Sequence, residues 1–351
     1  MAALWHHGGE IYDKTVAMDY SVNTNPLGLP PSVKEALSAD FAYAERYPDT
    51  ECRALKQALA EKYGLPESFF LCGNGASELF QLIVRAAAPA SALVTAPTFS
   101  GYEKALRDSG VSPAYHRLEK ERGFSLTERF LEDLKAGPDL VFLCQPNNPN
   151  GSTVEPLLME KIVEVCRERR IRLIVDECFL EFVDGAEALT ARRFLRENPF
   201  VTVVSAFTKI YAMPGIRLGY LMTADEAFLA AMKRAQSEWS VSGAAQTAGL
   251  AALSETAYVE EAKAMIRAER QILTDGLRTL GLKVYPSEVN YLLFEADRDV
   301  AGPLLEKGIL IRRCANYEGL DEHFFRIAVK KPEENRVFLE AIREILTAEG
   351  A

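Results

Sequence analysis

The chain has 351 residues, of which 48% are hydrophobic and 26% are charged, and its formal net charge is -10. This length suggests about two domains, each large enough for its own core. The acidic balance argues against nucleic acid or an anionic membrane surface as the main partner, although a few local arginines could still bind a small anionic substrate.

The first 39 residues are predicted to form an irregular arm that ends in a short helix. The segment 1–7 lacks a basic region followed by an apolar core, so it does not read as a secretory signal. No apolar run approaches the roughly 20 residues that would span a bilayer. The six cysteines are dispersed without a Cys-x-x-Cys pair, which predicts reduced thiols in a cytoplasmic protein and gives no sign of a metal site.

Residues 40–240 alternate short apolar segments with amphipathic helical patterns. Helical patterns such as 78–88 and 155–169 separate several of the apolar segments. Strands that are apolar throughout and separated by amphipathic helices are typical of a mostly parallel sheet covered on both faces. We therefore predict a large α/β domain with strands at 69–72, 92–96, 140–144, 172–175, 201–205 and 218–222.

The pattern changes near residue 240, where we place a domain boundary to within about ten residues. A long helical stretch covers 255–280, and shorter helices are predicted at 300–307 and 333–346. The intervening segments read as short strands at 283–285, 291–294, 309–311 and 324–328. Residues 241–351 are therefore predicted to form a small α+β domain.

Polar motifs follow the ends of the first two apolar strands. The segment Gly73-Asn74-Gly75-Ala76-Ser77-Glu78 follows the first strand and opens a helix. Small residues let the backbone approach a phosphate, and a helix N-terminus favours an anion, although a tight turn alone would also explain them. The segment matches neither the dinucleotide nor the nucleotide-binding loop pattern. Phe99 follows the second strand and could stack on a flat ring or pack beneath its loop.

An amide and a carboxylate follow the next two strands. Pro146 and Pro149 stiffen the backbone on either side of Asn148 and so aim its side chain. Asp176 comes at the end of a buried strand, where a carboxylate is costly unless a positive or hydrogen-bonding group meets it. A protonated pyridine nitrogen would meet that need. A helix cap or an ion pair is the alternative.

An amine and a guanidinium complete the series. Lys209 lies just past the fifth strand, where desolvation would lower its pKa and allow a Schiff base. Arg217 could grip a phosphate in bidentate fashion, although a lone lysine and arginine on a loop are often only solvated charges. Ligands of parallel sheets bind beyond the carboxyl ends of the strands. Taken together, these groups match the needs of pyridoxal 5'-phosphate.

The motifs Asn148-Pro149-x-Gly151, Asp176-Glu177 and Thr208-Lys209…Gly215-x-Arg217-x-Gly219 resemble those of fold type I aminotransferases, which share the aspartate-aminotransferase fold. The resemblance covers nearly the whole chain. It implies that Lys209 carries the cofactor and moves protons, that Asp176 pairs with the ring nitrogen, and that Asn148 binds the phenolic oxygen. Phe99 would stack on the ring, and Arg326 would bind the substrate α-carboxylate. The implied phosphate ligands are Gly75, Ala76, Ser77, Thr208, Arg217 and, from a homodimeric neighbour, Tyr47.

Two branches of the family are most similar, histidinol-phosphate aminotransferases and L-threonine-O-3-phosphate decarboxylases. The motif Arg46-Tyr47-Pro48-Asp49 occurs in both, whereas His7-Gly8-Gly9 and the segment 309–320 resemble the decarboxylases more closely. Phe179, where many aminotransferases have tyrosine, favours the same branch. Ala206 stands where the family commonly has a hydroxyl residue that contacts the cofactor phosphate. The resemblance implies decarboxylation of threonine phosphate to (R)-1-amino-2-propanol O-phosphate for cobalamin, with histidinol-phosphate transamination as the alternative.

The same resemblance suggests how a phosphorylated amino acid would be held. We predict that Arg312 grips the substrate phosphate, that His7 closes over it, and that Asn23 lies among the substrate-binding residues. The alternatives are that Arg312 forms a surface ion pair and that His7 lies in solvent. A non-catalytic protein on this fold is a third hypothesis. The presence of Lys209 argues against it, because such a protein would be expected to lose that lysine.

Overall fold

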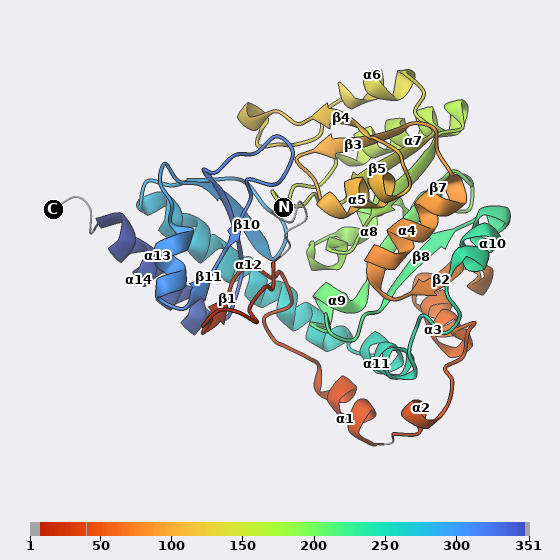
Figure 1. The fold of residues 1–351 in the computed structure, drawn as a ribbon, viewed down its shortest axis with the longest axis horizontal. Coiled ribbons are helices and arrows are strands. Elements are labelled where there is room, and N and C mark those ends of the chain that lie inside the picture. The colour runs from red at the N-terminus through yellow and green to blue at the C-terminus, as the bar shows by residue number, and fades with distance from the viewer. Residues whose placement is uncertain (1–7, 40, 348–351) are drawn as a thin grey trace.

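The computed structural model describes residues 8–39 and 41–347, which form a larger and a smaller part side by side (Figure 1). The larger part is built on a seven-stranded sheet with the strand order β2-β8-β7-β6-β5-β3-β4. Its strands are β2 (Phe70–Gly73), β3 (Ala92–Ala96), β4 (Ala114–Arg117), β5 (Leu140–Cys144), β6 (Arg172–Asp176), β7 (Val201–Ala206) and β8 (Gly219–Thr223).

Five neighbouring strands of this sheet, from β4 to β7, are parallel, and β8 runs antiparallel to both β7 and β2. The strand β2 therefore has the same direction as β7. The predicted mostly parallel sheet is confirmed, and the sequence located every strand except β4. That strand lies at the edge of the sheet, and its exposed Ala114 and Arg117 break the apolar run on which the prediction depended.

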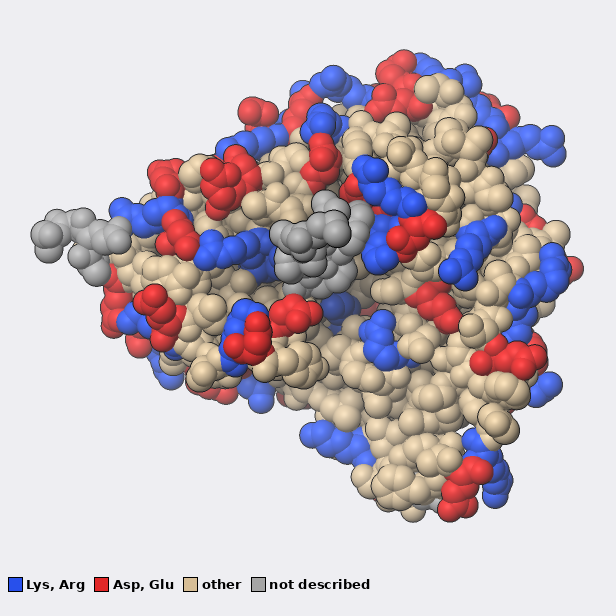
Figure 2. All heavy atoms as spheres, viewed as in Figure 1, with Lys and Arg blue, Asp and Glu red and all other residues tan. Residues whose placement is uncertain are grey.

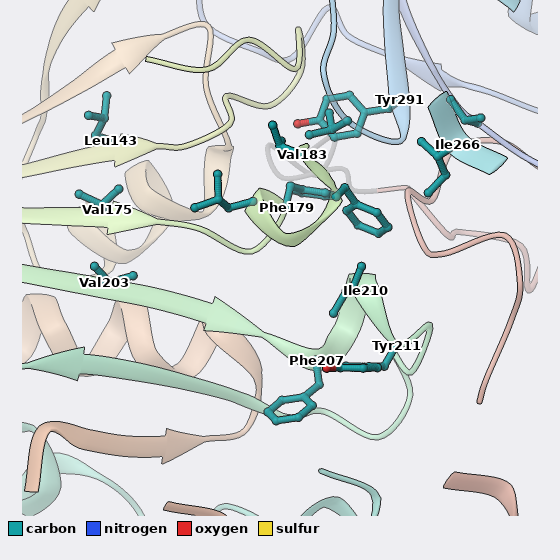
Figure 3. Packing of buried hydrophobic residues seen from close by; sticks show 14 of the residues in the cluster. Leu143, Val175, Phe179, Val183, Val203, Phe207, Ile210, Tyr211, Ile266 and Tyr291 are labelled. Carbon is teal, nitrogen blue, oxygen red and sulfur yellow. The ribbon is translucent and has the colours of Figure 1, made fainter. Parts of the chain in front are cut away.

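Helices cover both faces of the sheet, which explains why its strands are apolar throughout. On one face, Leu140 and Phe142 pack with α4 (Gly75–Ala87), α5 (Ser100–Asp108) and α10 (Glu226–Ala235). On the other face, Val141 and Leu143 pack with α3 (Arg53–Tyr63) and α7 (Pro156–Arg169). Figure 3 shows Leu143, Val175 and Val203 in a row across three neighbouring strands of this second face.

The smaller part contains an antiparallel sheet with the order β12-β13-β10-β9. Its strands are β9 (Lys283–Val284), β10 (Tyr291–Glu295), β12 (Arg312–Arg313) and β13 (Phe324–Ala328). Three helices belong to this region, α12 (Thr256–Thr279), α13 (Ala301–Glu306) and α14 (Pro332–Thr347). The strand β1 (Met18–Asp19) pairs in parallel with β11 (Ile309–Leu310), so the N-terminal segment is joined to this part of the molecule.

Predicted strand ends in the smaller part differ from the structure by one residue at β9, β10 and β11. The strand expected at 309–311 ends at Leu310, and Arg312 begins a separate strand that pairs with β13. The remaining helices are α1 (Pro31–Ala39), α2 (Ala42–Glu45), α6 (Phe130–Lys135), α8 (Ala186–Leu189), α9 (Phe207–Ile210) and α11 (Gly243–Leu253), with 3₁₀ turns at Glu67–Phe69, Lys120–Arg122, Leu180–Phe182 and Ala191–Phe194. Across residues 8–39 and 41–347, no helix combines the length and apolarity needed to cross a bilayer.

Candidate active site

The strand ends that carry the polar motifs meet at one edge of the large sheet. The strands β2, β3, β5, β6 and β7 point their carboxyl ends to this edge, and the antiparallel β8 begins there. A cavity of about 220 Å³ opens at this edge. It is lined by Gly8, Ser21, Val22, Asn23, Ala76, Ser77, Phe80, Phe99, Cys144, Asn148, Asp176, Cys178, Phe179, Ala206, Thr208, Lys209, Arg217, Arg312, Tyr317 and Arg326.

Most of the predicted site residues line this cavity. They are Asn23, Ala76, Ser77, Phe99, Asn148, Asp176, Thr208, Lys209, Arg217, Arg312 and Arg326. Gly75 lies directly beside it, next to Arg217. Tyr47 does not line the cavity of its own chain; it is 79% exposed and stacks on Trp239 with ring centroids 4.5 Å apart. His7 lies outside the described residues.

Lys209 lies in α9, immediately after β7, with its amine inside the cavity. Its Nζ atom lies 5.6 Å from the centroid of the Phe179 ring. Burial, followed by the positive charges of Arg326 and Arg217, lowers the pKa of Lys209 to about 8. The uncharged amine that nucleophilic attack on a carbonyl requires therefore forms at a much lower pH than for an exposed lysine, and it becomes the main form above about pH 8.

Asp176 ends β6 and is held by two donors on either side of its carboxylate. The hydroxyl of Tyr102 donates to Oδ2 at 2.5 Å, and the backbone N–H of Cys178 donates to Oδ1 at 3.0 Å. Burial raises the pKa of Asp176, while the hydrogen bonds from Cys178 and Tyr102 and the charge of Lys209 oppose that rise. A cationic ring nitrogen would complete the stabilisation of this carboxylate. Sequence reasoning gave no role to Tyr102, which lies three residues after Phe99.

The adjacent Glu177 faces a different environment. Its carboxylate accepts hydrogen bonds from the Thr190 hydroxyl at 2.7 Å and the Ala191 backbone N–H at 2.6 Å, and it lies 3.7 Å from the Arg192 guanidinium. Burial raises the pKa of Glu177 to about 7. Glu177 therefore anchors the segment after β6, while Asp176 faces the cavity.

The amide of Asn148 is oriented by two donors that contact its oxygen. Arg326 Nη1 donates to Asn148 Oδ1 at 2.5 Å, and the Tyr317 hydroxyl donates to the same atom at 3.3 Å. Because the oxygen is engaged, the Nδ2 group is the part of the amide that can donate to a molecule in the cavity. Tyr317 also accepts from Arg326 Nη1 at 3.2 Å, and sequence reasoning did not identify it.

A cradle of small residues surrounds the start of α4. A Cβ atom at Gly75 would lie 2.6 Å from Arg217 Nη2, and a Cβ at Gly219 would lie 2.8 Å from the Ala76 nitrogen. Only glycine at these two positions lets the arginine and the helix N-terminus come so close together. The first-turn N–H groups, the Ser77 and Thr208 hydroxyls and the Arg217 guanidinium are the donors that a phosphate monoester needs. The cavity residues therefore fit pyridoxal phosphate, and Ala206 contributes a methyl group where a hydroxyl was expected.

Two arginines enter the cavity from neighbouring strands of the small sheet. Arg312 in β12 and Arg326 in β13 are directly opposite each other in the antiparallel register, so their side chains leave the same face of the sheet. Both residues are buried, at 8% and 5% exposure. The alternative that Arg312 forms a surface ion pair is therefore wrong.

Asn23 carries an unmet hydrogen-bonding requirement at the cavity wall. Its side chain is 1% exposed, and within residues 8–39 and 41–347 neither its Nδ2 nor its Oδ1 atom has a hydrogen-bond partner. The same holds for Arg326 Nε. Leaving a buried polar group unsatisfied costs about 1–3 kcal/mol, which a bound polar ligand would recover.

The N-terminal arm passes close to this wall. Gly8 lines the cavity, and a side chain at that position would collide with the backbone carbonyl of Ser21. The Gly9 N–H donates to the Ser21 hydroxyl at 2.8 Å, and the Ser21 carbonyl accepts from Arg326 Nη2 at 3.0 Å. The arm is thus attached to the same residue that supports Arg326.

Comparison with known proteins gives matches over nearly the whole chain. A family model described as aminotransferase class I and II matches residues 15–342. A threonine-phosphate decarboxylase from Salmonella typhimurium is 38% identical over 353 residues, covering 97% of this chain and 96% of the relative. A histidinol-phosphate aminotransferase from Symbiobacterium thermophilum is 34% identical over 330 residues, covering 92% and 89%. The solved histidinol-phosphate aminotransferase from Clostridium acetobutylicum has a TM-score of 0.88 at 29% identity, covering 94% of this chain and 99% of that chain.

Proposed function

The chain belongs to the aminotransferase class I and II family, and from this premise we propose that it decarboxylates L-threonine O-3-phosphate with pyridoxal 5'-phosphate bound at Lys209. The product would be (R)-1-amino-2-propanol O-phosphate, an intermediate of cobalamin biosynthesis. The similarity to a threonine-phosphate decarboxylase along both chains supports this reaction. The buried, unbridged cysteines support a reducing compartment, which we propose to be the cytoplasm.

The observation that carries the proposal is the cross-strand pair of Arg312 and Arg326 beside Lys209. On the face seen in Figure 2, Lys and Arg are intermingled with Asp and Glu. Two buried guanidinium groups in one cavity favour a substrate with two anionic groups close together. Threonine phosphate has a carboxylate and a phosphate in one molecule, whereas histidinol phosphate has a phosphate and no carboxylate.

We assign a role to each of the cavity side chains according to its position. Pyridoxal phosphate, when bound, supplies an electron-accepting ring that takes up the electron pair of the Cα–carboxylate bond. Asp176 keeps the ring nitrogen protonated, and Arg217 with the start of α4 holds the cofactor phosphate. Arg326 and Arg312 hold the two ends of the substrate and so set which bond at Cα is aligned for cleavage. Lys209 Nζ delivers the proton that replaces the lost carboxylate at Cα.

The proposed reaction is tested by incubating the holoenzyme with L-threonine O-3-phosphate. We expect carbon dioxide and a phosphorylated amine in equal amounts, with no requirement for an oxoacid. A parallel incubation with histidinol phosphate and 2-oxoglutarate serves as the comparison. Efficient oxoacid-dependent transamination there, with no carbon dioxide from threonine phosphate, would assign the chain to the aminotransferase branch instead.

We also propose that the enzyme is a homodimer in which Tyr47 reaches the cofactor phosphate of the partner subunit. Tyr47 is well exposed and lies outside its own cavity, so it is free to contact a second chain. Other large apolar side chains on nearby elements are also exposed, namely Phe41 before α2, Trp239, and Leu250 in α11. A surface of this kind is typical of protein–protein contacts.

Mixing two inactive variants tests the shared site. A Lys209→Met chain combined with a Tyr47→Ala chain should form hybrid dimers in which one of the two sites has both residues intact. Activity should therefore rise to about a quarter of the wild-type value when hybrids make up half of a statistical mixture. If Tyr47 serves its own chain, activity will stay at the level of the separate variants although differently tagged subunits co-purify.

A further inference from the structure

We infer that Asn316 and Tyr317 are positioning residues that each hold one of the two cavity arginines and thereby set the spacing of the two anion-binding groups. The two residues are neighbours on the turn that joins β12 to β13, the strands that carry Arg312 and Arg326. We call them the Asn316–Tyr317 bracket. This inference rests on the proposed function, because it assigns the arginines to the two ends of one substrate.

Asn316 holds the first arginine. Its Oδ1 atom accepts a hydrogen bond from Arg312 Nη2 at 2.7 Å. The Arg312 guanidinium also lies 5.5 Å from the centroid of the Tyr317 ring, within the range of a cation–π contact. Arginine has several freely rotating bonds, so an acceptor at one corner of the guanidinium restricts where its remaining N–H groups point. The remaining N–H groups then face a fixed direction.

Tyr317 holds the second arginine and the cofactor-facing amide at once. Its hydroxyl accepts from Arg326 Nη1 at 3.2 Å and donates to Asn148 Oδ1 at 3.3 Å. The direct bond from Arg326 Nη1 to Asn148 Oδ1 closes a three-membered network. Tyr317 is buried in an apolar cluster with Tyr285 and Phe324, so its ring is fixed in position. The hydroxyl therefore couples the orientation of Arg326 to that of Asn148.

The bracket predicts two separable defects. Loss of the Asn316 acceptor should loosen Arg312 and weaken recognition of the substrate phosphate. Loss of the Tyr317 hydroxyl should loosen Arg326 and Asn148 and weaken recognition of the carboxylate. A merely structural role for the turn would instead weaken both ends together, because both strands of the small sheet would shift.

The test uses two truncated probes on the holoenzyme. O-phosphoethanolamine has an amine and a phosphate but no carboxylate, and L-threonine has an amine and a carboxylate but no phosphate. Dissociation constants are measured by calorimetry and by the change in cofactor absorption for the wild type, Asn316→Ala and Tyr317→Phe. Phenylalanine keeps the ring beneath Arg312 and removes the hydroxyl alone.

We expect a crossed pattern. Asn316→Ala should raise the dissociation constant of O-phosphoethanolamine about fivefold and that of L-threonine less than about twofold. Tyr317→Phe should raise the dissociation constant of L-threonine more than that of O-phosphoethanolamine, because the hydroxyl bonds Arg326. This variant alone should shift the pH titration of the cofactor absorption, because Asn148 contacts the cofactor ring in the proposed site. Tyr285→Phe is the matched control. Tyr285 belongs to the same apolar cluster as Tyr317, but its hydroxyl hydrogen-bonds Glu295. This control should leave the dissociation constants of both probes unchanged.

The bracket is overturned if each variant weakens the binding of both probes equally, or if neither variant weakens the binding of either probe. Thermal unfolding is measured for both variants. Midpoints close to that of the wild type show that neither variant is misfolded. If the two variants show the crossed pattern but the wild type releases no carbon dioxide from threonine phosphate, the proposed reaction is overturned and the bracket stands. If the wild type binds neither O-phosphoethanolamine nor L-threonine, the bracket is overturned, whereas the proposed reaction is still decided by carbon dioxide release from threonine phosphate.

Discussion

Lys209→Met is expected to lower decarboxylation by about 10⁴-fold or more and, at the same time, to stabilise the cofactor-free protein near pH 7. The catalytic loss follows because Lys209 is the amine proposed to attach the cofactor and deliver the proton at Cα. Borohydride treatment of the wild-type holoenzyme should fix the cofactor on the peptide that contains Lys209. Fixation on any other peptide would contradict the assignment.

The gain in stability follows from the lowered pKa of the same amine. Burial and neighbouring arginines lower the pKa of Lys209 from 10.5 to about 8 in the folded chain. Between these two pH values the unfolded chain binds more protons, so the free energy of unfolding rises with pH. Below pH 8 the folded chain bears the full cost of the buried charge, about 3 kcal/mol. Methionine has a similar length and no charge, so it removes this cost.

Urea unfolding of the two cofactor-free proteins measures the effect. The Lys209→Met variant should be more stable than the wild type by up to about 3 kcal/mol at pH 7, and the difference should shrink as the pH rises from 8 to 10.5. Lys34→Met, on the exposed surface of α1, is the control and should leave both activity and stability unchanged. A Lys209 variant that is less stable at every pH would show that the amine makes a favourable contact in the folded protein.

The fold was predictable because burial leaves a clear pattern in a doubly covered sheet. Strands such as β5 and β6 are apolar on both faces, so each stands out as a short continuous run between helices. The edge strand β4 and the two-residue strand β12 carry polar residues and give no such signal. They form by pairing with the apolar strands β3 and β13, and this contribution of the neighbouring strand is not contained in their own local pattern.

The gathering of the predicted site residues at one cavity was predictable for a similar reason, since most of them follow the end of a strand in the same sheet. The contacts that orient those groups were not predictable from the sequence. Tyr102 is separated from Asp176 by 74 residues, and Tyr317 is separated from Asn148 by 169. The first contact depends on how α5 packs against the large sheet and the second on how the two parts of the molecule meet. A tyrosine hydroxyl on a helix or turn has no distinctive sequence pattern. The roles assigned to the site residues, including Tyr47 and His7, stay predictions.

Arg312→Ala is expected to remove most of the preference for the phosphorylated substrate. Arg312 is buried, is oriented by Asn316, and lies across the strand pair from Arg326. Truncating one partner of a buried, hydrogen-bonded charge pair costs several kcal/mol, so kcat/KM for threonine phosphate should fall by about 10²–10³-fold. The value for L-threonine, which lacks the phosphate, should change less than about threefold.

The neighbouring Arg313 provides a matched control on the same strand. Side chains alternate along a strand, and Arg313 points to the opposite side, where it is half-exposed and forms an ion pair with Asp299 at 2.7 Å. Arg313→Ala should therefore leave the substrate preference intact although it removes the same charge from the protein. Arg312→Lys should recover only part of the lost preference, because an ammonium group keeps the charge but lacks the planar fork that binds phosphate oxygens in pairs. An unchanged ratio of the two kcat/KM values in Arg312→Ala, with the cofactor spectrum retained, would mean that another group binds the phosphate.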